Sequence, residues 1–175
     1  YLTQEEAPWG GFSPDASFPA IHAEKGILRY TVAGQWDEAC DRPIRLTALN
    51  GGAKINIVPP KAMAEFETGV PEEIEKAVAA FPKRDKLTLE KNGTKVIVHA
   101  KGVGAHAMQP WEGESAVTTL LELLDTLDYG PAGAKDYLGK LARTAGKDCY
   151  GRGVGVACED DLSGPLSNNL GILTV

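Results

Sequence analysis

The sequence has few of the residues that build disulfides, redox sites or metal centres. Its 175 residues include 3 cysteines and 3 histidines. The cysteines are odd in number and form no CxxC pair, which favours reduced thiols in a cytoplasmic protein over a disulfide framework. No apolar run approaches the ~20 residues of a membrane helix, and no secretory signal opens the chain, so we expect no membrane partner.

Positive charge is also in short supply. The chain has 18 Lys and Arg against 24 Asp and Glu, a formal net charge of −6. Because binding to nucleic-acid phosphates requires clustered cations, this balance argues against a nucleic-acid partner. The length and the apolar content of 43% are sufficient for one domain with its own core.

The three histidines do not form a zinc-binding motif. His22 and Glu24 share one face of an extended segment, but no third ligand is near them in the sequence. His99 lies within a strand-like run, and neither HExxH nor His-x-Asp occurs. We therefore predict no metal site in this chain.

Alternation and turn residues predict several strands in the first half. Residues 26–32 are dense in β-branched and aromatic side chains and predict a first strand. Residues 45–49 and 55–58 flank Asn50-Gly51-Gly52, which predicts a hairpin. Residues 62–67 can form a further strand.

The following segments alternate helix and strand signals. Pro71 opens a helix that Pro82 ends, with acidic residues in its first turn. Residues 86–90 and 94–101 flank an Asn-Gly turn and predict a second hairpin, and residues 117–127 carry the apolar spacing of a helix. Together they predict an α+β fold of the ferredoxin-like kind, in which an antiparallel sheet is backed by two helices on one face.

The ends of the chain suggest a larger parent. A short helix is expected over residues 134–143, and residues 170–175 form an apolar, strand-like run with nothing after it. Since the chain also starts at Tyr1 without Met, we expect it to be a piece of a longer protein. An unpartnered strand at 170–175 would favour a homodimer of the fragment.

The most informative stretch is residues 102–116, which joins a predicted strand to a predicted helix. It carries His106 between small residues, followed by Pro110 and Gly113. Rigid loops between regular elements often carry function. A helix-capping or carbonyl-bonding imidazole is the alternative that spacing alone leaves open.

This stretch resembles the lid (dimerisation) domain of the M20 family of zinc peptidases, most of all its PepV-type dipeptidases. Residues 11–26 are similar to that family's passage from the catalytic domain into the lid, and residues 50–59 to its lid strand ending in an Asn-x-Val-Pro turn. The three stretches follow the family's order and cover most of the chain. Ser115 stands where an Asn is usual.

The resemblance implies a function. His106 would donate a hydrogen bond to the scissile carbonyl oxygen of a dipeptide substrate. Asn56 would bind substrate or orient His106, although a turn-forming role is an equal alternative. Two zinc ions and the general base would lie in a catalytic domain absent from this chain, so the fragment alone would be inactive and hold no cofactor.

The same resemblance implies a division of the chain. Residues 1–26 would connect to the missing catalytic domain, residues 27–130 would form the lid, and residues 131–175 would begin a second lid half. Two other functions stay open: a stand-alone, non-catalytic α+β interaction or dimerisation module, and the lid of an M20 relative that hydrolyses another amide, such as an acylamino acid. His-x-Asp and Glu-Glu motifs in the flanking parent sequence would favour the peptidase.

Overall fold

The computed structural model describes Gly10, residues 24–146 and residues 148–175. Its strands are β1 (Ile44–Gly51), β2 (Lys61–Thr68), β3 (Leu87–Asn92), β4 (Lys95–Lys101), β5 (Glu159–Asp160), β6 (Gly164–Pro165) and β7 (Leu173–Thr174). Its helices are α1 (Pro71–Ala80), α2 (Ala116–Leu124) and α3 (Ala132–Leu141), with short helical turns η1 (Arg84–Lys86), η2 (Pro110–Glu112) and η3 (Ala142–Gly146). His22 and most of residues 11–26 lie outside the described residues.

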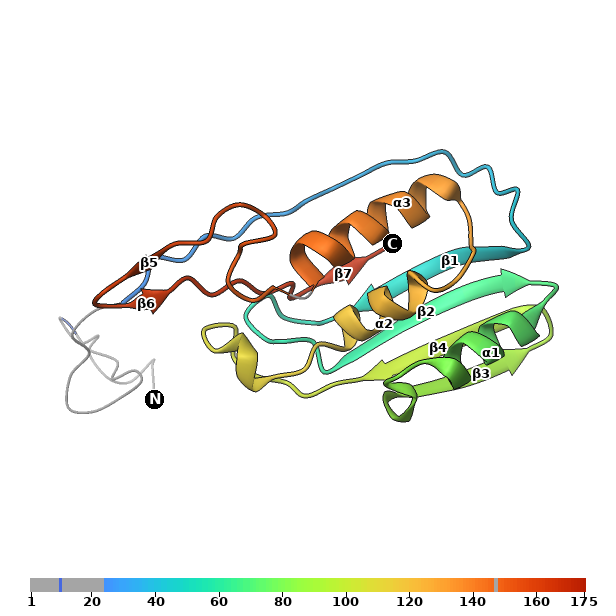
Figure 1. Cartoon of the computed structure of the whole chain (residues 1–175), viewed down its shortest axis with the longest axis horizontal. Coiled ribbons are helices and arrows are strands. Elements are labelled where there is room, and N and C mark those ends of the chain that lie inside the picture. The colour runs from blue at the N-terminus through green and yellow to red at the C-terminus, as the bar shows by residue number, and fades with distance from the viewer. Residues whose placement is uncertain (1–9, 11–23, 147) are drawn as a thin grey trace, which may run out of the picture.

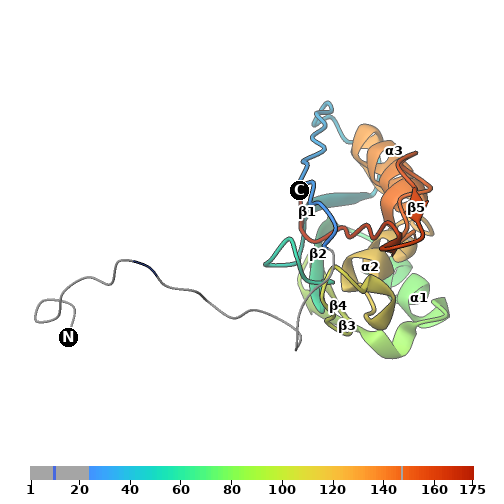
Figure 2. The same cartoon turned by 90° about the vertical axis from the view of Figure 1, so that its left-hand side faces the viewer.

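Five strands form one antiparallel sheet in the order β3-β4-β2-β1-β7, and β5 and β6 form a separate small hairpin (Figure 1). Figure 2 shows α1, α2 and α3 on the same side of the sheet. β2 and β3 run parallel with β4 between them, and α1 connects them, which is the split βαβ arrangement of ferredoxin-like folds. The predicted α+β fold class is confirmed.

The core lies between the sheet and α2. Alternate residues of β2 and β4, including Phe66, Val96 and Val98, are buried, whereas His99 and its same-face neighbours are not. α2 is apolar on most of its surface because it packs against the sheet on one side and against α3 and η3 on another. The opposite face of the sheet therefore stays open among the described residues.

A bulge in β1 sets which of its side chains reach the core. Its pairing with β2 shifts register between Leu46 and Ala48. Leu46 and Leu49 are consequently both buried although they are three residues apart, which strict alternation would forbid.

Several predicted elements are confirmed. α1 begins at Pro71, β3 and β4 form the predicted hairpin around Asn92-Gly93, and α2 follows the His106 loop. α3 covers most of the helix expected at 134–143. β2 occupies the strand predicted at 62–67.

The strand predicted at residues 26–32 is wrong. This segment is extended but unpaired, and Ile27 and Leu28 are each 83% exposed. A strand must pair with a neighbour, and the outer side of β1 is already occupied by Gly130 and by β7. High β-propensity without a paired neighbour leaves residues 26–32 as an extended strap, which Tyr30 anchors by donating to Asn168 Oδ1 at 3.0 Å.

The hairpin predicted between residues 45–49 and 55–58 is also wrong. β1 continues through Gly51 and pairs with β2, with Gly51 opposite Ala62. Residues 52–60 form a loop instead. The sequence Asn50-Gly51-Gly52 predicted a tight hairpin turn, but Asn50 and Gly51 belong to β1. Of the three, only Gly52 has a positive φ, at +79°.

The terminal run at 170–175 is not unpartnered. β7 pairs with the end of β1, and Val175 and Leu49 exchange backbone hydrogen bonds of 2.8 and 3.2 Å. This removes the argument that favoured a homodimer, which stays an untested prediction. Leu173 of β7 and Leu138 of α3 belong to the same core as β2 and β4.

None of the helices in the described part of the chain combines the length and apolarity needed to cross a membrane.

Candidate functional site

The His106 loop, residues 102–115, returns on itself before α2 begins. Val103 and Glu114 exchange backbone hydrogen bonds of 2.9 and 2.8 Å, which close its base. Ser115 caps α2 by accepting from the backbone N–H of Thr118 at 3.2 Å, so the change from the usual Asn retains a good cap. The loop is therefore fixed at both ends by the sheet and the helix.

The Asn56 loop, residues 52–60, lies directly beside it. Ile57 and His106 form an antiparallel bridge. The Val58 N–H donates to the Ala105 carbonyl and the Ala107 N–H to the Asn56 carbonyl, both at 2.9 Å. Two stretches that sequence analysis selected separately are thus joined by backbone hydrogen bonds.

The imidazole of His106 is exposed and oriented from its own loop. The backbone N–H of Met108 donates to Nδ1 at 3.2 Å. An Nδ1 that accepts is unprotonated, so the neutral ring carries its proton on Nε2. Within the described part of the chain Nε2 has no hydrogen-bond partner, and its N–H is therefore available as a donor.

The side chain of Asn56 is exposed, and among the described residues it makes no hydrogen bond to His106. In the described structure only its backbone joins the two loops, and Ile57 is the residue opposite His106. A substrate-binding role for the Asn56 carboxamide stays a prediction.

A third segment that sequence analysis missed completes the site. Asn169 donates from Nδ2 to the carbonyl oxygens of Ile55 and Ile57, at 3.2 and 3.1 Å. These partners are 114 and 112 residues away in the sequence, and no local pattern marks Asn169.

An aromatic stack supports the far end of the His106 loop. Trp111 of η2 stacks on Tyr150 with ring centroids 5.8 Å apart, and the Arg152 guanidinium lies 4.8 Å from the Tyr150 centroid. The contact with Tyr150 gives Arg152 a structural partner on this surface.

Backbone N–H groups of Gly153 and Tyr150 donate to Asp148 and hold the pKa of its carboxyl below its usual range.

The other candidate residues do not converge. His99 lies on the open sheet face with Nε2 3.4 Å from Glu90. The Ser115 hydroxyl is engaged in capping α2.

The described residues do not fit a metal centre. Across residue 10, 24–146 and 148–175, no three His, Cys, Asp or Glu side chains are placed to hold an ion together. His22, half of the His22–Glu24 pair considered above, lies outside that range. The chemistry that this part of the chain can offer is hydrogen bonding from His106 and its neighbours.

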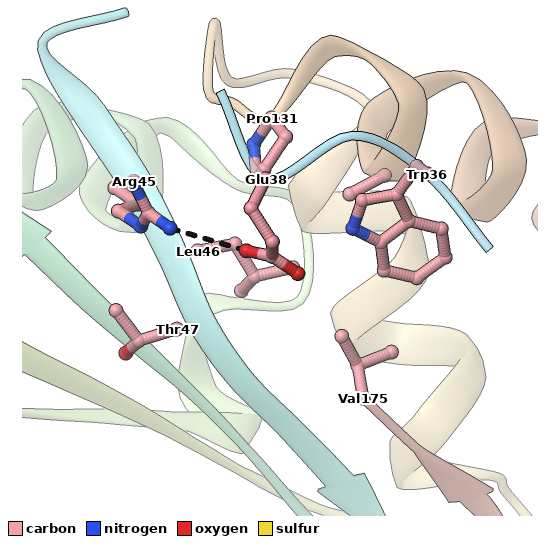
Figure 3. A pocket seen from close by; sticks show the side chains of 8 residues that line it. Trp36, Glu38, Arg45, Leu46, Thr47, Pro131 and Val175 are labelled. Atoms are coloured by element: carbon pink, nitrogen blue, oxygen red, sulfur yellow. Dashed lines mark hydrogen bonds and ion pairs between the residues drawn. The ribbon is translucent and has the colours of Figure 1, made fainter. Parts of the chain in front are cut away.

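A cavity of about 190 Å³ lies elsewhere, between β1, α3, Val175 and the segment that carries Trp36 and Glu38. Figure 3 shows Arg45 directed at Glu38 across it, with Trp36, Pro131 and Val175 around them. The Arg45–Glu38 ion pair, 3.1 Å long, leaves no net charge to attract a charged ligand. None of its lining residues belongs to the two site loops.

The fold and the paired loops define an exposed site at one end of an α+β sheet, and comparison with known proteins gives it a context. No family model matches the chain. The protein named "Putative dipeptidase YtjP" of Bacillus subtilis (strain 168) is 33% identical over 181 residues, which cover 99% of this chain and 38% of that protein. The "Beta-Ala-Xaa dipeptidase" of Lactobacillus delbrueckii subsp. lactis is 31% identical over 172 residues, which cover 97% of this chain and 36% of that protein.

The chain is thus related in sequence to dipeptidases over nearly its whole length, and it is a dipeptidase-related domain. It spans well under half the length of these relatives.

Proposed function

We propose that this chain is the lid domain of a cytoplasmic, zinc-dependent dipeptidase of the M20 family and PepV type. In this proposal it covers a dipeptide bound to a catalytic domain of the same parent protein. That domain supplies two zinc ions and the general base. The names of the relatives support peptide hydrolysis over the hydrolysis of other amides.

The observation that carries the proposal is the orientation of His106. Its Nδ1 accepts from the Met108 N–H, so the proton of the neutral ring is on Nε2, and the imidazole is exposed. A donor held in this way before substrate arrives needs no reorganisation when charge develops nearby.

The chemistry assigned to this donor is oxyanion stabilisation. As water adds to the scissile carbonyl, negative charge builds on its oxygen, and the Nε2–H of His106 donates to that oxygen. The hydrogen bond strengthens as the charge grows, so it favours the transition state over the bound substrate. Asn56, on the adjoining loop, hydrogen-bonds the substrate in this proposal.

Replacing His106 with Ala in the full-length parent tests the assignment. We expect kcat to fall on the order of 100- to 1000-fold, the usual effect of removing one oxyanion donor, with KM changed much less. Zinc content should not change, because His106 is assigned no role as a metal ligand. Steady-state kinetics with dipeptides and metal analysis measure both quantities.

His99→Ala is the matched control, since it removes an imidazole from the open sheet face, where β4 pairs with β2 and β3 and His99 belongs to neither loop. It should leave kcat near the wild-type value. Near-full kcat in His106→Ala, or loss of zinc from it, would contradict the proposal and return His106 to a structural role in its loop.

A further inference from the structure

We infer that Asn169 is a positioning residue, which holds the Asn56 loop so that the His106 loop keeps its place against it. This inference rests on the proposed function of His106. Asn169 reaches across from the segment before β7 and donates to two carbonyl oxygens, those of Ile55 at 3.2 Å and Ile57 at 3.1 Å. These carbonyls flank Asn56, so the bonds fix the peptide that carries it.

The chemistry of the side chain matches this task. A primary amide has two N–H donors on one nitrogen, one for each carbonyl. A carboxylate in the same place would set oxygen against oxygen, and an apolar side chain would offer no donor. Among side chains of this size, only Asn can serve both carbonyls.

The segment that carries Asn169 is itself firmly seated. Gly171 lies so close to the loop that a Cβ there would fall 2.5 Å from the Ile55 carbonyl oxygen. Two residues later the chain enters β7 and pairs with β1. Asn169 therefore connects the sheet to the Asn56 loop.

From that loop the constraint passes to His106. Val58 and Ala107 donate the two hydrogen bonds, each 2.9 Å long, that bracket the Ile57–His106 bridge. Movement of residues 55–57 would lengthen both bonds and displace the imidazole. A misplacement of a catalytic group by about 1 Å can cost a large part of turnover. The hydrogen bonds of Asn169 should therefore affect kcat, although among the described residues Asn169 makes no hydrogen bond to His106 itself.

The neighbouring Asn168 provides a matched control. Its side chain accepts from Tyr30 and donates to the Asp148 carbonyl at 3.4 Å, and among the described residues it makes no hydrogen bond to either site loop. Asn168→Leu and Asn169→Leu make the same chemical change one residue apart.

The first measurement is amide hydrogen exchange of Val58 and Ala107 in this chain. Asn169→Leu should raise both exchange rates about tenfold, the effect of losing two ordinary hydrogen bonds, while Asn168→Leu leaves them unchanged. Amides of β2 and β4 should keep their protection in both variants. Equal effects of the two substitutions, or unchanged rates in Asn169→Leu, would overturn the inference. If Asn169→Leu does not fold, Asn169→Ser makes the same comparison, because it leaves room for water.

The second measurement is kinetic, in the full-length parent. Asn169→Leu should lower kcat about tenfold with a smaller change in KM and no loss of zinc, and Asn168→Leu should not. If His106→Ala lowers kcat but Asn169→Leu does not, the positioning role is wrong and the proposed function stands. If Asn169→Leu raises the exchange rates of Val58 and Ala107 but His106→Ala retains full kcat, Asn169 does position the loops and the proposed function is wrong.

Discussion

Two glycines with positive φ show how differently one residue type can be constrained. Gly52, at φ +79°, begins the Asn56 loop, and a Cβ there would lie 1.9 Å from the carbonyl oxygen of Gly171. Gly93, at φ +62°, turns the β3–β4 hairpin with open space around it. Both need the left-handed conformation, but only Gly52 also needs the absence of a side chain.

The pair gives a prediction at the scale of a single residue. Gly93→Ala should lower the free energy of unfolding by about 1 kcal/mol, the cost of left-handed backbone alone. Gly52→Ala should cost about 2–5 kcal/mol, because overpacking adds to that strain. Urea denaturation of both variants measures the difference. Equal losses would show that the contact with Gly171 relaxes freely.

Among the elements, α2 carries most of the packing. It buries seven of its residues: Ala116, Val117, Thr119, Leu120, Leu121, Leu123 and Leu124. α1 buries only Ile74 fully, because it covers the sheet margin near β3 and leaves the rest of its surface in solvent. Removing apolar side-chain volume should therefore lower the free energy of unfolding far more in α2 than in α1.

Leu120→Ala should cost about 2–5 kcal/mol, since it opens a cavity in the layer between the sheet and α3. Val78→Ala, in the half-buried face of α1, should cost about 1 kcal/mol or less, because solvent or neighbouring side chains can fill the space. Chemical denaturation followed by circular dichroism checks both values. A smaller loss for Leu120→Ala than for Val78→Ala would contradict this division of the core.

The elements also show what sequence could predict. β3, β4, α1 and α2 each carry a local signal: alternation, an Asn-Gly turn, a leading Pro or apolar residues at helical spacing. Residues 26–32 carried an equally good strand signal, but pairing depends on a free edge, which local sequence does not report. The outer side of β1 is occupied by Gly130 and β7.

In the candidate site, too, the local sequence identified residues but not their long-range partners. His106 and Asn56 were selected from short stretches that resemble a known family, and the structure joins their loops. Asn169 was missed because its partners are more than 100 residues away. A single carboxamide in an irregular segment has no period or spacing that would mark it.

At the scale of the whole molecule, we expect this chain alone to bind no stoichiometric zinc and to hydrolyse no dipeptide. A two-metal hydrolase needs several His and carboxylate ligands converging on ions roughly 3.5–4 Å apart. No such group occurs among the described residues. Isothermal titration with zinc and a dipeptide hydrolysis assay test this. Tight one-to-one binding would contradict it and draw attention to His22.

The long reach of Asn169 has a consequence for the order of events during synthesis. Contacts between distant residues form late because the intervening chain must first be closed into a loop. On a ribosome adding roughly 5–20 residues per second, the 112 residues from Ile57 to Asn169 take between about 6 and 22 seconds to emerge. β1, β2 and the β3–β4 hairpin can pair during that interval, whereas the Asn56 loop still lacks the two hydrogen bonds from Asn169. The candidate site therefore becomes ordered later than the strands β1 to β4 that carry it.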